Sequence, residues 1–258
     1  MPILRKLLGG GDIRVADPLH PTGSFLFPGD NRRVRKRARK LAIKEPGTIR
    51  WLHDTIRPND VIYDIGANIG IYTVFAAARA TAGRVHAFEP HAGNFALLLQ
   101  TILLNDLGAR VTPLSIALDA ESGCSDFHYR ELLPGSTGSQ VAASPLARKL
   151  SHVVTELKAT LCIDDMIRDA VLAPADVIKI DVDGNELRIL RGMSELLRET
   201  PPRSIQVEVD PALDNAVREH MTSCGYRAVD EHFSMAGQRR IDRGDDPGAY
   251  PRQIIYAP

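Results

Sequence analysis

The sequence predicts an α/β domain in which a doubly wound, mostly parallel β-sheet carries helices on both faces. Short apolar runs rich in β-branched residues at 61–65, 84–88 and 176–180 are typical of buried parallel strands. Segments with helical apolar spacing follow the first two runs, and this alternation indicates a parallel sheet with right-handed crossovers. Because such a sheet gathers its strand ends at one edge, we expect a ligand crevice there.

The composition is that of one globular domain. The chain has 258 residues, 44% of them hydrophobic, and its formal net charge is zero, so we expect no general attraction to nucleic acid. No apolar run approaches the length that spans a membrane. The three cysteines are far apart, with no Cys-x-x-Cys pair, which argues against a zinc site and favours free thiols in the cytoplasm.

Residues 1–44 are interpreted as a lead-in to the domain. Within it, the stretch 32–40 holds seven basic residues in nine. Val34, Ala38 and Leu41 recur at helical spacing, so the run predicts a helix with a narrow apolar stripe and a solvated basic face. No aromatic residue is interleaved for stacking on bases. The alternative is a patch that binds an acidic or phosphorylated substrate.

The main domain, 45–258, opens with a helix from Pro46, and the strand 61–65 follows. This strand runs into the sequence Asp64-Ile65-Gly66-Ala67-Asn68-Ile69-Gly70, directly before an apolar helix pattern. A strand that enters a helix through a glycine-bearing turn brings backbone close to a ligand and points the positive end of the helix at it. The turn therefore predicts a site for a nucleotide-like ligand that carries a negative group.

Two details separate the candidate ligands. In the dinucleotide fingerprint Gly-x-Gly-x-x-Gly, glycines clear space for a pyrophosphate, whereas here the middle position is Asn68 and the third glycine is absent. Asp64 would repel a pyrophosphate but attract the amino group of a methionine moiety, which favours S-adenosylmethionine. Glu89 ends the next predicted strand and can accept hydrogen bonds from both ribose hydroxyls of either ligand.

Three blocks carry a resemblance to a known family: Asp64–Gly70, the tripeptide Phe88-Glu89-Pro90, and Asp176–Glu186. Together they look like the FkbM family of S-adenosylmethionine-dependent methyltransferases. The resemblance implies the Rossmann-like class I methyltransferase fold, a seven-stranded sheet whose last strand is antiparallel, and S-adenosylmethionine as cofactor. It also implies an acceptor hydroxyl on a sugar or on a secondary metabolite such as a polyketide. Asp183 and Asn185 stand where the family usually has Glu and Ala.

The next two elements continue the alternation of strand and helix. Apolar residues at helical spacing predict a helix over 95–102, and the run 111–118 predicts a third strand. The end of that strand is expected at the crevice, where Ala117 would lie near the adenine of the cofactor.

An insertion then interrupts the alternation. Residues 119–170 contain two half-exposed strand patterns, 125–129 and 155–162, which are joined by a Gly- and Ser-rich stretch. They predict a hairpin or flap that shapes the acceptor pocket, since long loops over a crevice are usually functional. Near the end of the chain, 233–238 and 253–256 predict a closing pair of strands.

Carboxylates are concentrated after the predicted strand 176–180. Asp181, Asp183 and Glu186 follow it within six residues, and a carboxylate beside an acceptor hydroxyl can take its proton. Asp181 is the first candidate because its strand is expected to face the methyl group. The other two acids are further catalytic candidates. Alternatively, these acids could bind a divalent cation, or they could have purely structural roles. A cluster of acids without His or Cys at metal-ligand spacing is weak evidence for a metal site, so we predict none.

The sequence thus predicts an S-adenosylmethionine-dependent O-methyltransferase that acts on a small hydroxyl acceptor. The residues expected to hold the cofactor are Asp64, Gly66, Asn68, Gly70, Glu89 and Ala117. Two alternatives stay open: a nicotinamide-dependent oxidoreductase, disfavoured by the altered glycine pattern, and a non-catalytic nucleotide-binding protein of the same fold. Assembly into a homo-oligomer is also left open.

Overall fold

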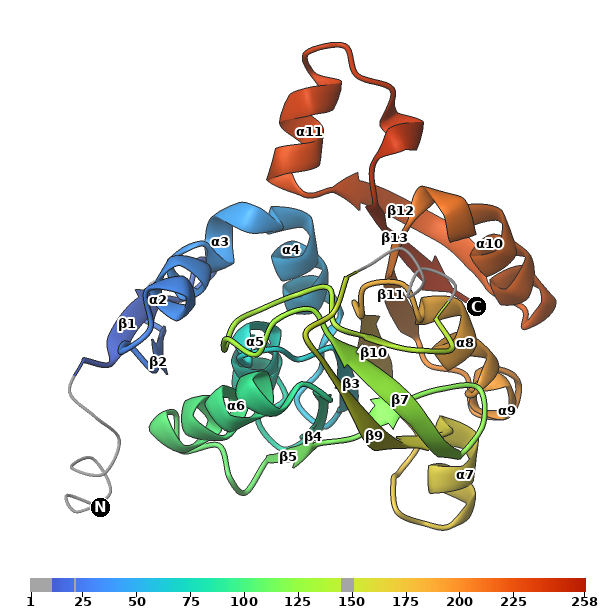
Figure 1. The fold of residues 1–258 in the computed structure, drawn as a ribbon, viewed down its shortest axis with the longest axis horizontal. Coiled ribbons are helices and arrows are strands. Elements are labelled where there is room, and N and C mark those ends of the chain that lie inside the picture. Colours follow the sequence, from blue (N-terminus) through green and yellow to red (C-terminus); the bar gives the residue numbers. More distant parts are fainter. Residues whose placement is uncertain (1–10, 21, 145–150) are drawn as a thin grey trace.

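A seven-stranded sheet runs through the centre of the computed structural model, which describes residues 11–20, 22–144 and 151–258 (Figure 1). In spatial order its strands are β12 (Arg227–Phe233), β13 (Arg252–Ala257), β11 (Ser204–Val209), β10 (Val177–Ile180), β3 (Val61–Ile65), β4 (Arg84–Phe88) and β5 (Val111–Leu114). β13 runs antiparallel to the other six strands of this sheet, which are parallel to one another. The predicted seven-stranded sheet with an antiparallel last strand is confirmed.

Helices cover both faces of the sheet (Figure 1). They are α4 (Pro46–Thr55), α5 (Ile71–Arg79), α6 (Ala92–Leu104), α7 (Ile163–Arg168), α8 (Glu186–Arg191), α9 (Ser194–Glu199) and α10 (Asp214–Ser223). Successive residues of β3 face opposite layers: Ile62 packs in a core with α4 to α6, and Tyr63 in a core with α7 to α10. This burial on both faces explains why the central strands are mostly apolar, with Asp64 of β3 and Lys179 of β10 among the buried exceptions.

The lead-in is folded against the same core. β1 (Ile13–Ala16) and β2 (Ser24–Phe27) form an antiparallel hairpin, and α2 (Arg32–Arg39) and α3 (Leu41–Lys44) follow. The side chain of Asn31 caps α2 by accepting from the backbone N–H groups of Arg33 and Val34. Val34 and Ala38 are fully buried, which confirms the predicted apolar stripe. Residues 1–10 of the predicted lead-in lie outside the described residues.

A second, four-stranded sheet is built from the insertion. Its order is β6 (Ala117–Leu118), β9 (Val154–Leu161), β7 (Gly123–Tyr129) and β8 (Gln140–Val141), and β7 pairs antiparallel with β9 as the predicted hairpin requires. The single strand predicted over 111–118 is wrong. It divides after Leu114, and its last two residues pair with β9, because apolar spacing predicts extended backbone but not the pairing partner.

A C-terminal arm separates β12 from β13 and projects beyond the sheet at the top of Figure 1. It consists of α11 (Met235–Ile241) and a 3₁₀ turn (Pro247–Ala249). The strand predicted over 233–238 is therefore wrong beyond Phe233. The Ser234 side chain accepts from the backbone N–H of Gly237 and starts α11 instead, since serine is a favoured helix cap.

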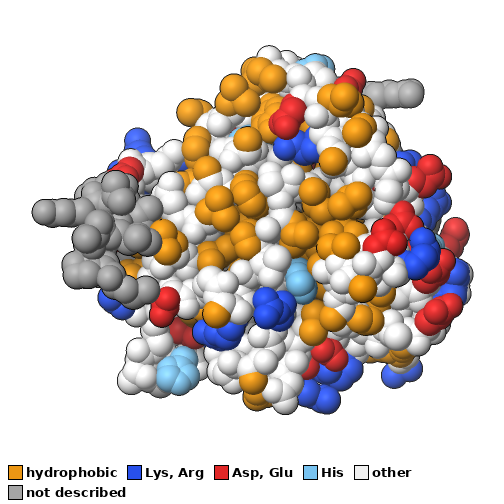
Figure 2. All heavy atoms as spheres, turned by 90° about the horizontal axis from the view of Figure 1, so that it is seen from below, with side chains coloured by type: hydrophobic (Ala, Val, Ile, Leu, Met, Phe, Trp, Pro, Cys, Tyr) orange, Lys and Arg blue, Asp and Glu red, His pale blue; other side chains and the backbone are white. Residues whose placement is uncertain are grey.

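The face of the molecule seen from below the view of Figure 1 carries mixed side chains. Figure 2 shows apolar groups over its middle, with Lys and Arg intermingled with Asp and Glu along its edge. Leu103 of α6 and Leu157 of β9 are among the exposed apolar residues. This face therefore has no stripe of one charge sign. Among the described residues, no helix is long and apolar enough to cross a membrane.

Candidate active site

A cavity of about 540 Å³ opens at the carboxyl ends of the parallel strands. Its walls come from the turn after β3, the segments after β4 and β10, the end of β11, helices α2 and α3, and the stretch 135–139. The strand order reverses at β3, which is where ligands bind in open α/β sheets. The volume falls within the range of about 300–1,000 Å³ that is usual for small-molecule sites.

The turn after β3 lies in left-handed backbone. Gly66, Asn68 and Gly70 have φ values of 81°, 51° and 86°. A Cβ atom on Gly66 would lie 1.8 Å from the carbonyl oxygen of Asp181, so the close approach of two chain segments itself requires glycine. Gly66 and Asn68 line the cavity as predicted. Gly70 lies outside its lining and caps α5, where the left-handed φ suits glycine.

Glu89 lies directly after β4 and is only 5% exposed. Its carboxylate accepts from the backbone N–H of Asn68 at 2.7 Å and from that of His91 at 2.8 Å. Burial raises the pKa of Glu89 to about 7, although these hydrogen bonds oppose the shift. The side chain of Asn94 also hydrogen-bonds to this carboxylate, and the residue lines the cavity, so its remaining acceptor capacity is available to a bound ligand.

Asp64 and Ala117 do not line this cavity. Asp64 is 2% exposed; it accepts from the hydroxyl of Thr73 at 2.6 Å and lies 3.5 Å from the ammonium of Lys179. Its carboxylate is thus committed to protein groups below the cavity floor. Ala117 lines a smaller, mostly apolar cavity of about 40 Å³, which shares Gly66 with the main one.

We use the term acid–lysine cluster for Asp181, Glu208, Lys44 and Lys179. Asp181 follows β10, and its carboxylate lies 3.6 Å from the ammonium of Lys179 and bonds to the Glu208 side chain. Burial opposes ionisation of Asp181, but the charges of Lys179 and Lys44 outweigh it and hold its pKa below the usual range. The Asp181 charge, together with burial, raises the pKa of Glu208 well above the usual range. The two carboxyl groups are therefore coupled, and their pKa values are displaced in opposite directions.

Asp183 and Glu186 have different positions. Asp183 lines the cavity at a φ of 61°; its carboxylate accepts from the backbone N–H of Gly138 at 2.7 Å, and burial raises its pKa. Glu186 lies outside the cavity lining. Its carboxylate accepts from the backbone N–H groups of Val182 at 3.2 Å and of Gly184 at 3.0 Å. Glu186 is placed to hold the segment after β10 in shape rather than to touch a ligand.

The pKa of Glu186 predicts a measurable pH dependence of stability. Burial raises this pKa from 4.5 to about 7, so the native state keeps a proton that the unfolded chain has released. The resulting stabilisation is complete below pH 4.5 and is lost as the pH rises towards 7, by up to about 1.4 kcal/mol per pH unit. In Glu186→Gln, urea denaturation should show a smaller fall in unfolding free energy between pH 5 and 7. The exposed Glu219→Gln should keep the wild-type slope, and equal slopes in all three proteins would contradict this assignment.

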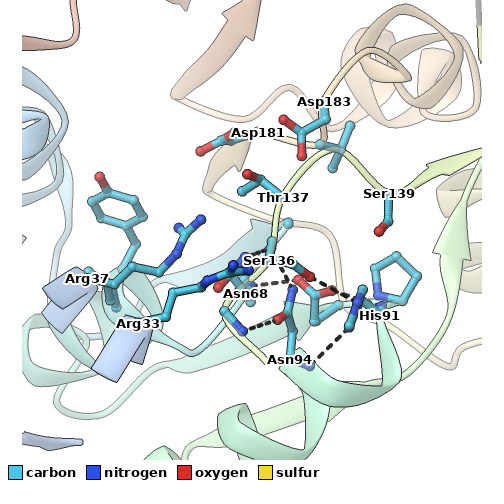
Figure 3. Close-up of a pocket in the computed structure, with 18 of the residues that line it drawn as sticks. Arg33, Arg37, Asn68, His91, Asn94, Ser136, Thr137, Ser139, Asp181 and Asp183 are labelled. Atoms are coloured by element: carbon cyan, nitrogen blue, oxygen red, sulfur yellow. Dashed lines mark hydrogen bonds between the residues drawn. The ribbon is translucent and has the colours of Figure 1, made fainter. Parts of the chain in front are cut away.

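We name 134–139 the capping loop because it lies across the cavity (Figure 3). The carbonyl oxygen of Ser136 accepts from the side-chain amides of Asn68 at 2.9 Å and of Asn94 at 3.2 Å. On the other side, Gly138 is held by the carboxylate of Asp183. His91 lies within 3.0 Å of the Ser136 hydroxyl and also lines the cavity. The sequence interpretation missed His91 and Asn94; their only local signal is that they directly follow Phe88-Glu89-Pro90.

The basic run also lines the cavity. Its contributing residues are spaced by three or four positions and fall on one face of α2 and α3: Arg33, Lys36, Arg37, Lys40 and Lys44. Figure 3 shows Arg33 and Arg37 reaching in from α2, while Asp181 and Asp183 enter from the opposite side. Lys36 and Lys40 are solvent-exposed, as the solvated-face interpretation expects, and they also border the cavity, so both interpretations of the basic run stay predictions. The apolar stripe predicted which side of α2 is buried. It did not predict that the basic residues beside the stripe would line a cavity.

The strand order, the antiparallel last strand and a cavity at the glycine turn after the first central strand are the features of a class I methyltransferase fold. Comparison with known families then identifies the particular group. The methyltransferase FkbM domain matches residues 64–228, so the chain belongs to this family. The resemblance drawn from the three sequence blocks is confirmed.

Named relatives are similar over most of the chain. The hexuronic acid methyltransferase AglP of Haloferax volcanii is 27% identical over 66% of this chain and 64% of its own length. The 31-O-demethyl-FK506 methyltransferase FkbM of Streptomyces tacrolimicus is 29% identical over 63% of this chain and 71% of its own length. A crystal structure of a methyltransferase FkbM from Methylobacillus flagellatus aligns with a TM-score of 0.49 and 16% identity, covering 81% of this chain and 50% of that chain. The chain thus spans less than two thirds of the haloarchaeal relative.

Proposed function

We propose that this protein transfers a methyl group from S-adenosylmethionine to a hydroxyl of a small acceptor. One observation carries the proposal: a single cavity joins Glu89, which suits a ribose, to Asp181, which is ionised and suits an attacking hydroxyl. Membership of the FkbM family supports the same reaction class. A sugar or a secondary metabolite as acceptor agrees with the hexuronic acid and FK506 in the names of two relatives.

The walls of the cavity suggest how the cofactor lies. Glu89 would accept the two ribose hydroxyls, and Gly66 would let the cofactor approach the backbone closely. The small apolar cavity lined by Phe88 and Ala117 lies next to this position and would extend towards the adenine. Asp64 supports the site indirectly, by balancing the charge of Lys179 below the floor. Direct contact between Asp64 and the cofactor is not part of the proposal.

Bound S-adenosylmethionine supplies an electrophilic methyl group on a sulfonium. In the proposed transfer the acceptor oxygen would form a bond to this methyl carbon while the carbon–sulfur bond would break, and the electron pair of that bond would stay on sulfur. The protein must align these atoms and remove the hydroxyl proton. Asp181 takes that proton, because Lys44 and Lys179 keep it ionised beforehand. These two ammonium groups also place positive charge beside the acids, and the absence of a metal site stays a prediction.

The direct test is isothermal titration with S-adenosylhomocysteine, with NAD as the control ligand. We expect binding of the first and none of the second. Binding of NAD alone would favour the oxidoreductase alternative. If S-adenosylhomocysteine binds but no methyl transfer to any sugar or polyketide acceptor is detected, the non-catalytic alternative gains support. The cytoplasmic location suggested by the free thiols stays a prediction.

A substitution tests the ribose assignment of Glu89. Glu89→Ala should weaken the binding of adenosine by about 1–3 kcal/mol through loss of charge-assisted hydrogen bonds. The substitution also removes the acceptor for Asn68 and His91, so a second ligand is needed as a control. 2′,3′-Dideoxyadenosine lacks the ribose hydroxyls and should bind equally to both proteins. Equal losses for both nucleosides would mean that Glu89 supports the loop without touching the ribose.

A further inference from the structure

We propose that the acceptor carries an anionic group, a carboxylate or a phosphate, which the basic face of α2 and α3 binds. This inference rests on the proposed methyl transfer and adds the chemical class of its acceptor. The hydroxyl to be methylated would lie at Asp181, and the anionic group would lie across the cavity at the helices.

Within the part of the chain that the structure describes, three of the five basic side chains have no hydrogen-bond or ion-pair partner at their charged ends. Arg33 forms an ion pair with Glu131, and Lys44 with Glu45. Among the described residues, neither a hydrogen bond nor an ion pair engages the charged ends of the other three, which are Lys36, Arg37 and Lys40. Three unpaired cations on one wall of a cavity would repel one another, and an anionic ligand would relieve this repulsion.

The acids of the opposite wall are mainly engaged by other groups of the protein, although the charge of Arg37 also acts to lower the pKa values of Asp181 and Asp183. Asp181 lies 3.6 Å from the ammonium of Lys179, and the Asp181 charge together with burial raises the pKa of Glu208 well above its usual range. Asp183 is bound to the capping loop through Gly138. Positive charge therefore remains in excess on the helical wall, although the whole chain has a formal net charge of zero. Arginine in such a wall offers a planar pair of donors that matches a carboxylate or phosphate.

One competing explanation involves the cofactor. S-adenosylmethionine has its own carboxylate, which the same residues would attract. The two explanations differ in which ligand loses affinity when the wall is neutralised. S-adenosylhomocysteine keeps the carboxylate and 5′-methylthioadenosine lacks it, so the pair isolates the contribution of this group.

The test uses two double variants with the same change in net charge. Arg37→Gln with Lys40→Gln removes two charges from the cavity wall. Arg32→Gln with Arg39→Gln removes two exposed charges from the same helix outside the cavity lining. Inorganic phosphate, glucuronate and glucose are titrated calorimetrically into each protein, with and without saturating S-adenosylhomocysteine. The two cofactor analogues are titrated separately.

We expect at least one of the two anions to bind the wild-type protein more tightly than glucose, and the stronger one identifies the anionic group. The cavity-wall double variant should weaken that binding about tenfold or more, since each lost charged hydrogen bond contributes on this scale. The control double variant should bind like wild type, and both variants should keep wild-type affinity for S-adenosylhomocysteine.

Other outcomes overturn the inference. These are equal binding of glucose and glucuronate, no binding of either anion, or equal losses in the two double variants. Weakened binding of S-adenosylhomocysteine but not of 5′-methylthioadenosine would assign the wall to the cofactor carboxylate instead. Failure of the wild-type protein to bind S-adenosylhomocysteine would count against the proposed function. The anion titrations in the absence of S-adenosylhomocysteine would still test whether the basic face of α2 and α3 binds an anion.

Discussion

Asp181→Asn should lower kcat by about 10²–10⁴-fold, the range usual for loss of a general base, while S-adenosylhomocysteine still binds. Asparagine has nearly the same shape but cannot take up the proton of the attacking hydroxyl. The charge balance of the acid–lysine cluster also changes, because Lys179 loses one of its two carboxylate partners. Methyl transfer under single-turnover conditions measures the chemical step directly, and calorimetry measures the affinity.

Glu208→Gln is the matched control for this experiment. The pKa of Glu208 is raised well above its usual range, which favours the protonated form, and a neutral amide that can donate to Asp181 imitates that form. We expect this variant to keep most of the activity that Asp181→Asn loses. The reverse order of effects, or equal effects of the two substitutions, would show that the proton and the charge are distributed differently. Near wild-type kcat in Asp181→Asn would remove Asp181 from the reaction.

Gly66→Ala is expected to abolish cofactor binding and to destabilise the fold together. The new Cβ would lie 1.8 Å from the carbonyl oxygen of Asp181, which is impossible without a backbone shift, and the φ of 81° is itself unfavourable for alanine. Because the collision involves the segment that carries Asp181, the cavity is distorted even where the chain still folds. Strain and lost packing of this kind typically cost several kcal/mol.

Gly108→Ala provides the control for backbone substitution as such. No atom lies within 4 Å of a Cβ added at Gly108, so this change should leave both melting temperature and cofactor affinity unaltered. Differential scanning fluorimetry with and without S-adenosylhomocysteine follows both quantities. A Gly66→Ala protein with wild-type melting and binding would mean that the turn relaxes freely and that the position does not shape the cavity.

The parts of the site that the sequence predicted are those encoded by short, local patterns. The strand ending at Ile65 with its glycine turn, Glu89 after the next strand, and Asp181 after β10 are each fixed by a strand and the residues that follow it. Parallel pairing then brings these strand ends together without further information. Gly66, Asn68, Glu89, Asp181 and Asp183 accordingly line the cavity as predicted.

The parts that the sequence did not predict depend on partners far away along the chain. The partner of Asp64 is Lys179, which balances its charge below the floor, so the carboxylate expected at the ligand is occupied. The side-chain amides of Asn68 and Asn94 donate to the carbonyl oxygen of Ser136 and hold the capping loop in place. The Gly- and Ser-rich sequence of this loop does not indicate which part of the protein it will contact. For the same reason the basic run could be assigned to a helix but not to the cavity that it faces.

Helix α2 has a consequence for how the acceptor range of such proteins changes. The family match begins at residue 64, after the helix that supplies most of the basic wall, whereas Gly66 and Glu89 lie inside it. Substitutions on one face of an eight-residue helix can therefore alter which molecules are admitted while the cofactor end of the cavity stays constant. Exchanging α2 between family members would be a compact way to redirect selectivity, because one element outside the shared segment would carry the change.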